Sequence, residues 1–460
     1  MAEDLNTEEL LDDDDYALDR DTVEPVLVAL REGDSEALIA ALEPVHPADI
    51  ADLLEQVDED TRLRLVQLYG KEFDGDILSE LNESVRESVI GALHPEVLAD
   101  AVRDLDTDDV VDLIEDLDEP QQEIILDALA VTDRAAVEQS LSYPEESAGR
   151  LMQRELVAAP EHWDVGHLID HMRAHEDLPD QFYHVILVDP RMRPTGYVTL
   201  GKIMASPRTT PLSEITEDSF RTIPVTQDEG DVAYAFNQYH LISAPVVDED
   251  DRLVGVITID DAMIILDEEH EEDILRLAGV GEGSLNDRVS ETVRARIPWL
   301  AVNLGTAIIA SLVIALFEDV IAGFVALAVL MPIVASMGGN AGTQSLTVAV
   351  RAIATKDLTS SNVWRVIRRE AAVGLINGAV FAVVMGIVGV IWFGTPMLGV
   401  VIAAAMVINL MVAGLAGVLV PVLLDRFNID PALASGTFVT TVTDVVGFFA
   451  FLGLAGIVLL

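Results

Sequence analysis

The stretch Pro431–Leu460 reads PALASGTFVTTVTDVVGFFAFLGLAGIVLL, and Asp444 is the only charged residue in it. An aspartate near the middle of a membrane span costs on the order of 3 kcal/mol, so such a residue normally faces a polar cavity, a partner or an ion. Thr437, Thr440 and Thr441 precede it at helical spacing, which places four oxygen-bearing side chains on one stripe of a helix. Oxygen ligands are what hard cations prefer, so the stripe predicts an ion path.

Four more apolar segments precede this one, and all five are long enough to cross the ~30 Å hydrocarbon core of a bilayer. They cover residues 297–317, 320–350, 371–393, 397–424 and 432–459. The second is too long for one upright span, and its interior from Pro332 to Thr347 contains a proline and three glycines: Pro332, Gly338, Gly339 and Gly342. We therefore expect non-helical backbone there, which at membrane depth must line a cavity or pack against protein.

The same segment carries polar side chains at helical spacing, namely Asn340, Thr343, Gln344 and Thr347. They can therefore face the stripe that bears Asp444. The alternative is that the glycines are close helix contacts and that the polar side chains bond across helices.

Basic residues gather on one side of the spans: Arg294 and Arg296 before the first, Arg351–Arg369 between the second and third, and Arg426 between the fourth and fifth. The positive-inside rule then predicts a multi-pass protein of the cell membrane with its long N-terminal half in the cytoplasm. Because the span count is odd, the C-terminus is expected outside.

Charge is concentrated in residues 1–296, which hold 73 acids and 21 bases. An acidic surface with only three lysines in the chain is typical of proteins in concentrated salt and predicts a halophile. Such a surface repels phosphate, so no nucleic-acid partner is expected. The lack of cysteine excludes disulfides and thiolate metal sites. Residues 1–22 form an acidic tail without the basic start or apolar core of a signal peptide, and we expect disorder there.

Residues 23–142 have the pattern of short amphipathic helices. The run from His46 to Thr61 is echoed from His94 to Asp109, and this repeat predicts helical hairpins stacked into a solenoid. Each histidine precedes a proline, so we interpret both as first-turn residues of helices, with metal ligation as the alternative.

Residues 143–206 and 207–265 each contain a strand, an acidic turn, a second strand and a helix start, an α/β module repeated twice. The pair resembles tandem CBS domains. In that family a Gly-x-x-Thr-x-x-Asp signature places a hydroxyl near a nucleotide phosphate and a carboxylate on the ribose. The second copy matches through Thr258 and Asp261, whereas the first has Thr199 followed by Lys202. The resemblance implies ATP or another adenine nucleotide at the second copy, with purely structural capping roles as the alternative.

A pair of Asp444 carboxylates from a twofold dimer, with amide and hydroxyl oxygens around them, suits a divalent ion that keeps much of its water, which is Mg²⁺ behaviour. The chain has no cysteine, and no histidine follows His270. Ligands for soft metals are therefore missing from the spans.

The order of acidic helical domain, paired CBS domains, charged connecting (plug) helix at residues 266–296 and five spans at 297–460 resembles the MgtE family of magnesium channels and transporters. The most specific motifs are Pro332 with GGNAGTQ at 338–344, RAIATKDL at 351–358 and TDVVG at 443–447. The resemblance implies a homodimer in the lipid bilayer with its pore between the subunits and hydrated Mg²⁺ held at Asp444. The implied polar neighbours of the ion are Asn340, Thr343 and Asn409, and the implied pore lining is Pro332, Gly338, Gly339, Gly342, Gln344, Thr440 and Thr441.

The resemblance also implies that cytosolic Mg²⁺ binds between acidic faces of the helical and CBS domains and that the connecting helix then closes the pore. When Mg²⁺ leaves, the faces repel one another and the pore opens. General surface acidity hides the ligands, and the candidates are Asp106, Asp108, Asp109, Glu268, Glu272 and Asp273.

The predicted fold class is therefore multidomain α plus α/β, with a cytosolic helical solenoid, a tandem CBS pair, a connecting helix and a five-helix transmembrane domain. The predicted function is a Mg²⁺-selective, channel-like transporter gated by cytosolic Mg²⁺. The alternatives are a membrane-anchored CBS nucleotide sensor without ion flux, and a carrier with broader divalent choice such as Co²⁺ or Ni²⁺. An enzyme is not expected, because no pair of nucleophile and base and no P-loop is present.

Overall fold

The computed structural model describes residues 20–115, 117, 119–175, 178–179, 181–217, 220–280 and 289–459. The chain divides into two compact units, Met1–Asp267 and Glu268–Leu460. The predicted disordered tail falls on residues 1–22, of which 1–19 lie outside the described residues, as do 281–288 of the predicted connecting helix and Leu460.

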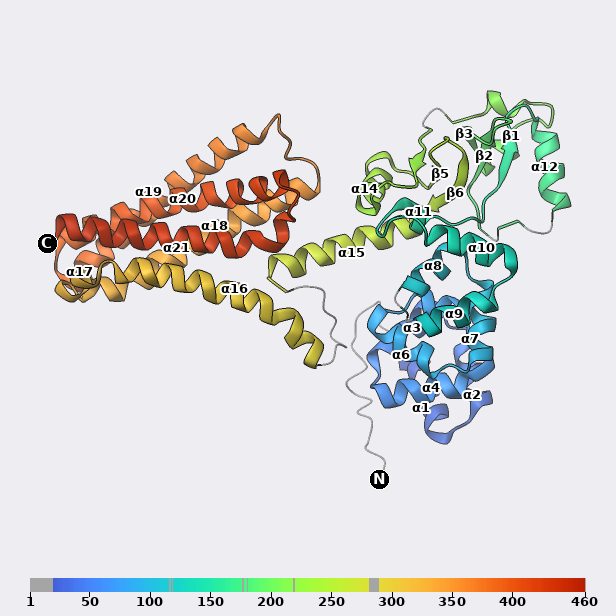
Figure 1. Cartoon of the computed structure of the whole chain (residues 1–460), viewed down its shortest axis with the longest axis horizontal. Helices are drawn as coiled ribbons and strands as arrows, with labels where there is room; N and C mark the ends of the chain where they lie inside the picture. Colours follow the sequence, from blue (N-terminus) through green and yellow to red (C-terminus); the bar gives the residue numbers. More distant parts are fainter. Residues whose placement is uncertain are drawn as a thin grey trace. The chain divides into compact units, whose positions relative to one another are not determined.

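The first unit starts with short helices packed around one apolar core that runs from Val23 to Val137 (Figure 1). The helices are α1 (Arg20–Glu32), α2 (Ser35–Leu42), α3 (Pro47–Gln56), α4 (Glu59–Tyr69), α5 (Asp76–Ser79), α6 (Glu83–Ala92), α7 (Pro95–Ala101), α8 (Thr107–Glu115), α9 (Glu119–Ala128) and α10 (Val131–Ser140), with 3-10 turns η1 (Gly70–Glu72) and η2 (Val102–Asp104). Each helix buries a stripe of Leu, Ile and Val, as amphipathic spacing dictates.

The repeated His-Pro pairs begin helices, as predicted. His46 is the N-cap of α3 and its Nδ1 accepts a hydrogen bond from the Ala48 N–H at 3.2 Å. His94 is the N-cap of α7, and a proline follows each histidine at the first helical position. The echo in the sequence therefore marks two equivalent helix starts in the solenoid.

Two small sheets with the same topology follow (Figure 1). In the first, β1 (Ala158–Pro160) pairs parallel to β2 (His184–Val188), which pairs antiparallel to β3 (Pro194–Thr199). In the second, β4 (Ile223–Pro224), β5 (Ser243–Val247) and β6 (Leu253–Thr258) repeat the order and the directions. The helices and turn of this region are α11 (Ala148–Leu151), α12 (Val165–Ala174), α13 (Leu200–Ala205), η3 (Leu212–Glu214), α14 (Glu229–Tyr239) and α15 (Ile259–Leu277).

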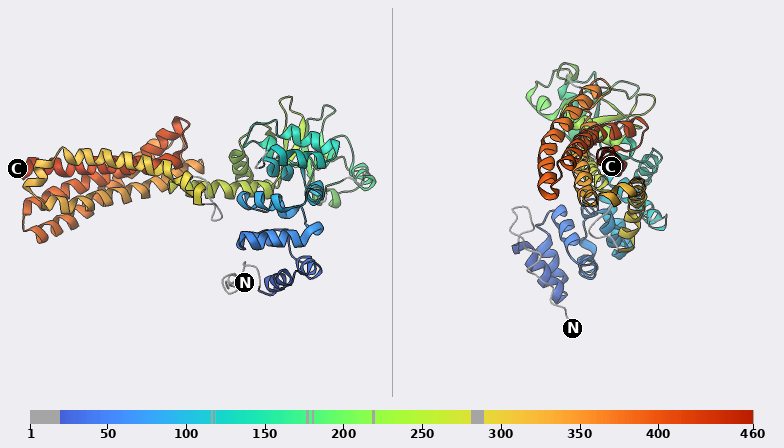
Figure 2. Two further views of the ribbon diagram at one scale, coloured as in Figure 1. Left: turned by 60° about the horizontal axis from the view of Figure 1, so that its bottom comes forward. Right: turned by 90° about the vertical axis from the view of Figure 1, so that its left-hand side faces the viewer.

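The second unit is helical (Figure 2). Its elements are α16 (Val289–Ala315), α17 (Glu318–Gly323), α18 (Ala326–Ala354), α19 (Val363–Phe393), α20 (Pro396–Arg426) and α21 (Pro431–Val458). Five of them, all except α17, are long and apolar enough to cross a membrane. Helix α20 is the most enclosed, because it packs against α18, α19 and α21.

The expectation of non-helical backbone near Pro332 is wrong. Helix α18 is continuous from Ala326 to Ala354 with Pro332 inside it. The excess length of the second apolar segment is taken up instead by the short helix α17 and a break at Phe324–Val325. A proline removes one hydrogen bond of a helix, and packing against neighbouring helices can hold the helix together in spite of that loss.

The glycines of α18 serve close helix packing. A Cβ at Gly338 would lie 2.3 Å from Nδ2 of Asn409 on α20, and one at Gly342 would lie 2.6 Å from Cγ1 of Val439 on α21. Side chains larger than hydrogen would therefore push these helices apart. Gly338 and Gly342 therefore follow the alternative stated above, in which the glycines are close contacts between helices.

Candidate functional site

Asp444 lies on α21, half-buried, and among the described residues it makes no hydrogen bond and no ion pair. Its threonine neighbours direct their hydroxyl hydrogens into the protein. Thr440 Oγ1 donates to the Gly436 carbonyl at 2.9 Å, and Thr441 Oγ1 donates to the Thr437 carbonyl at 2.6 Å. A hydroxyl that has donated its hydrogen keeps lone pairs for an incoming cation, so the stripe beside Asp444 is rich in acceptors.

Thr437 has a partner that the sequence did not reveal. Its hydroxyl donates to Oδ1 of Asn303 on α16 at 2.8 Å. This bond fixes the N-terminal half of α21 against α16, which also packs along α21. Thr437 therefore holds the helix in place, while Thr440 remains exposed on the stripe.

The residues predicted on α18 divide into two groups. Pro332, Asn340 and Thr343 are exposed, whereas Gly338 and Gly342 are buried against α20 and α21. Helices α18 and α21 pack side by side, so the structure brings the two predicted stripes to adjacent helices. An exposed polar face on a membrane helix requires something outside the chain to cover it or water to line it.

Asn409, predicted as a polar neighbour of the ion, lies fully buried between helices. Its Nδ2 donates to the Val334 carbonyl at 2.7 Å, and Oδ1 has no hydrogen-bond partner among the described residues. Added Cβ atoms at Gly338 and at Gly447 would both collide with its amide. Asn409 therefore joins α18, α20 and α21, and its carbonyl oxygen is the one group left over for a ligand.

Gln344 belongs to another surface. It lines a cavity of about 110 Å³ between α18, α19 and α20, together with Ser345, Glu370 and Asn377. Ser345 Oγ donates to Oε2 of Glu370 at 3.0 Å. Glu370 was not among the predicted site residues, although an acid at the edge of an apolar span is the signal that could have found it.

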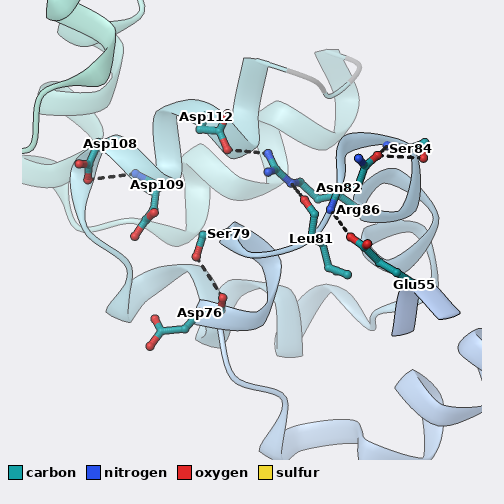
Figure 3. A network of polar contacts seen from close by, with 10 residues as sticks. All are labelled: Glu55, Asp76, Ser79, Leu81, Asn82, Ser84, Arg86, Asp108, Asp109 and Asp112. Atoms are coloured by element: carbon teal, nitrogen blue, oxygen red, sulfur yellow. Dashed lines mark hydrogen bonds and ion pairs between the residues drawn. The ribbon is translucent and has the colours of Figure 1, made fainter. Parts of the chain in front are cut away.

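In the first unit, acidic side chains meet at the starts of two helices. Asp108 and Asp109 occupy the first turn of α8, and Figure 3 shows them side by side with Asp112 farther along the same helix. Asp261, in the first turn of α15, faces both of them electrostatically. Asp112 is paired with Arg86 at 2.7 Å. The described residues place no cation within ion-pair distance of the other three carboxylates.

Like charge and burial act together on this cluster. Burial, then Asp261 and Asp109, raise the pKa of Asp108 well above its usual range. Burial, then Asp261 and Asp106, raise the pKa of Asp109 to about 7. Burial raises the pKa of Asp261 to about 6, although hydrogen bonds from Thr258 oppose that shift. At neutral pH the cluster is therefore poised to exchange protons for a cation.

The predicted nucleotide pair is part of the same cluster. Thr258 Oγ1 donates to Oδ2 of Asp261 at 2.6 Å, and the Thr258 N–H reaches the same oxygen at 3.3 Å. The carboxylate of Asp261, which the CBS resemblance places on a nucleotide ribose, thus bonds to Thr258 at the start of α15 and faces the acids of α8. Its nucleotide role stays a prediction.

The candidates in the connector meet a different environment. Arg276 pairs with Glu272 one turn earlier on α15, and its Nη1 lies 2.8 Å from Oδ2 of Asp430. Asp430 also caps α21, because its Oδ1 accepts from the Ala432 N–H at 2.7 Å. Burial, then Asp430, raise the pKa of Asp273, and His270 opposes them. Glu268 is exposed on the same helix.

Across the described ranges, no group of three or more His, Asp or Glu side chains has the arrangement of a metal site. The predicted sensor and pore ligands therefore stay predictions. Single carboxylates and oxygen-rich faces nevertheless fit Mg²⁺, which keeps several waters and takes only one or two carboxylates from the protein.

Comparisons with known proteins agree with this architecture. Residues 331–454 match the family model described as a divalent cation transporter, 45–146 match the MgtE intracellular N domain, and 148–208 and 212–268 match CBS domains. The magnesium transporter MgtE of Thermus thermophilus is 32% identical over 438 residues, which cover 94% of this chain and 97% of that protein. This chain belongs to the MgtE family.

A second relative, the magnesium transporter MgtE of Bacillus subtilis, is 27% identical over 431 residues, or 94% of this chain and 96% of that protein. Among solved structures, the cytosolic domain of the Mg²⁺ channel MgtE in complex with ATP is 29% identical and covers 53% of this chain and 99% of that one, with a TM-score of 0.49. The predicted fold class, a helical N domain, a CBS pair and five membrane helices, is confirmed.

Proposed function

We propose that this protein is a Mg²⁺-selective, channel-like transporter of the cell membrane, with a pore at a homodimer interface where Asp444 holds hydrated Mg²⁺. The observation that carries the proposal is the isolation of Asp444, the single charged residue of α21, which has no partner among the described residues. A carboxylate at that depth needs a counter-charge. A second copy of α21 and a hydrated cation between the two copies would supply one.

The surrounding oxygens support the same site. Thr440 and Thr441 keep acceptor lone pairs beside Asp444, and Asn340 and Thr343 are exposed on the neighbouring helix α18. Neutral oxygens of this kind contact the water shell of Mg²⁺ rather than the ion itself, which suits an ion that dehydrates reluctantly. The family membership supports Mg²⁺ as the cargo.

Gating by cytosolic Mg²⁺ is the second part of the proposal. Asp108, Asp109 and Asp261 lie close enough to raise one another's pKa without a described cation beside them, so like charge opposes the approach of α8 and the start of α15. A divalent ion that binds only the compact arrangement stabilises it by mass action. Low Mg²⁺ would leave the arrangement loose and the pore open.

The proposed orientation places the first unit in the cytoplasm and the C-terminus outside. Its support is the basic cluster from Arg351 to Arg369, at the end of α18, in the connecting loop and at the start of α19, which by the positive-inside rule marks the cytosolic side. Halophile origin remains a prediction from the acidic composition.

Flux into proteoliposomes tests the pore. Asp444→Asn keeps the shape of the side chain and removes its charge, and we expect Mg²⁺ uptake to fall by about two orders of magnitude, equivalent to ~3 kcal/mol. Asp425→Asn, at an exposed acid near the end of α20, is the matched control and should transport like the wild type. Unchanged uptake in Asp444→Asn would remove this residue from the mechanism.

The dimer interface is tested by cross-linking. The chain has no cysteine, so Thr440→Cys gives one thiol per protomer on the exposed side of α21. If two copies of α21 face each other across the pore, oxidation should join protomers through that thiol. A thiol introduced at Trp364, exposed at the start of α19, is the control and should not cross-link.

Two other functions make different predictions. A membrane-anchored nucleotide sensor would show no ion flux and would bind ATP or AMP with an affinity that Asp261→Ala abolishes. A carrier of broader divalent choice would transport Co²⁺ or Ni²⁺ in competition with Mg²⁺. Flux with each ion alone and in pairs separates these two from the Mg²⁺-selective channel.

A further inference from the structure

Three histidines recur at intervals of four residues along α12 and at its C-terminal end, in the first CBS domain. His167 and His171 lie on α12 one turn apart, and His175 is the C-cap residue that directly follows the helix, with an extended backbone. His167 is exposed, with 74% of its side chain accessible. Of the nine histidines in the chain, His162 and these three fall within one short segment. We call His167, His171 and His175 the histidine row.

The tautomers of two members are fixed by their partners. Nδ1 of His175 lies 3.0 Å from the His171 carbonyl, and Nδ1 of His167 lies 2.9 Å from Oδ1 of Asp164. A carbonyl or carboxylate oxygen can only accept, so in both neutral rings the hydrogen sits on Nδ1 and the lone pair on Nε2. Histidines that bind metals are oriented in this way, by donating the other ring N–H to a carbonyl or carboxylate.

The rings of His171 and His175 are close enough to act together. Their centroids are 4.0 Å apart, and the described residues offer neither nitrogen of His171 a hydrogen bond. Trp163 packs edge-on against His171 with ring centroids 5.0 Å apart, so this ring contacts both Trp163 and His175. Two imidazoles four residues apart bind zinc in metalloproteases when both lie on a helix; here the second follows the last turn of α12, and the 4.0 Å ring separation brings the two together instead.

We propose that His171 and His175 form a binding site for a borderline divalent transition-metal ion, such as Ni²⁺, Co²⁺ or Zn²⁺. Imidazole nitrogen selects these ions over Mg²⁺, which prefers oxygen. Because no closed set of three ligands is present in the described ranges, water completes the coordination of the ion. The site lies in the first unit, shares no residue with the acidic clusters on α8 and α15, and does not depend on the proposed pore or sensor.

Nickel titration of the full-length protein in detergent tests this site. With Mg²⁺ in large excess, calorimetry should show one saturable Ni²⁺ site, and Ni²⁺ should quench the fluorescence of Trp163, as judged by the difference from Trp163→Phe. His171→Gln and His175→Gln should each weaken Ni²⁺ binding by at least about tenfold. His162→Gln is the matched control, because His162 is exposed on the same segment but outside the row, and it should bind like the wild type.

The outcomes decide between a metal site and surface packing. Circular dichroism equal to that of the wild type would show that the glutamine variants are folded. Unchanged Ni²⁺ binding in both variants, or complete loss of binding in excess Mg²⁺, would overturn the proposal. Equal weakening in His162→Gln would also overturn it, because it would mean scattered histidine binding.

Discussion

The two ends of α15 meet acidic side chains in opposite ways. At its start, Asp261 faces Asp108 and Asp109 with no described cation beside them. At its other end, Glu272 and Asp430 converge on the guanidinium of Arg276. The first cluster has no cation of its own among the described residues, so only protons or an added cation can offset its charge, whereas Arg276 offsets the charge of the second. The site most sensitive to Mg²⁺ is therefore expected at the start of the helix.

The largest effect should come from removing charge at the first cluster. Ionising Asp109 at pH 8 against a pKa of about 7, compared with its ordinary 3.8, costs about 4 kcal/mol in the packed state. In the combined variant Asp108→Asn, Asp109→Asn, Asp261→Asn, the first unit should resist trypsin even without Mg²⁺. Its resistance should equal that of the wild type in the presence of Mg²⁺.

The control for this variant is Asp49→Asn combined with Asp60→Asn, at acids in the first turns of α3 and α4. These changes also reduce negative charge, and the Mg²⁺ dependence of proteolysis should persist. If the cluster variant still required Mg²⁺ for protection, the uncompensated cluster would not be the sensor.

The second effect is a pH dependence with a defined sign. The pKa values of Asp109 and Asp261 are raised to about 7 and about 6, so between pH 4 and 7 the packed state binds more protons than the unfolded chain. Stability without Mg²⁺ should therefore be highest near pH 4 and fall as the pH rises to about 7. The thermal midpoint of the first unit measures this slope, which should flatten in Mg²⁺ and vanish in the cluster variant. A midpoint that rises over this range would contradict the assignment.

The third prediction concerns the cluster around Arg276, which would lack a cation, like the cluster at the start of α15, once the arginine is replaced. Arg276→Gln leaves Glu272 and Asp430 without their shared cation, and the loss should be about 1 kcal/mol because the three side chains are partly exposed. Closure of the pore should then require several-fold more Mg²⁺, as read from flux against cytosolic Mg²⁺. Arg426→Gln, at an exposed arginine with no described ion pair, is the control. An unchanged Mg²⁺ requirement would mean that the guanidinium does not stabilise the closed state.

Much of this fold follows from local patterns in the sequence. Hydropathy located the five spans, and the repeated strand and turn pattern located the two sheets, because both depend on neighbours within a few residues. The continuity of α18 through Pro332 could not be predicted, since it depends on packing against helices far along the chain. A local rule about proline does not contain that information.

The candidate site shows the same division. Asp444 stood out because one charge in an apolar run is visible in sequence. The contacts of Asp261 with α8 and of Arg276 with Asp430 join residues separated by more than one hundred positions, and no spacing rule reports them. The sequence therefore proposed Glu272 and Asp273 as sensor ligands without showing that an arginine reaches the same cluster.

The smallest expected effect is that of Asp273→Asn. Its sign shows whether Asp273 is a Mg²⁺ ligand or is only repelled by Asp430. Asp273 is half-buried near Asp430, and its raised pKa shows that its charge is unfavourable there. If Asp273 is a bystander repelled by Asp430, Asp273→Asn should stabilise the closed contact by a few tenths of a kcal/mol and lower the Mg²⁺ needed for closure less than twofold. If Asp273 is a Mg²⁺ ligand, the same variant should raise that requirement. Glu271→Gln, at an exposed neighbour, controls for the general loss of one charge. Because Arg276 already supplies a positive charge to Asp430, we expect the first result.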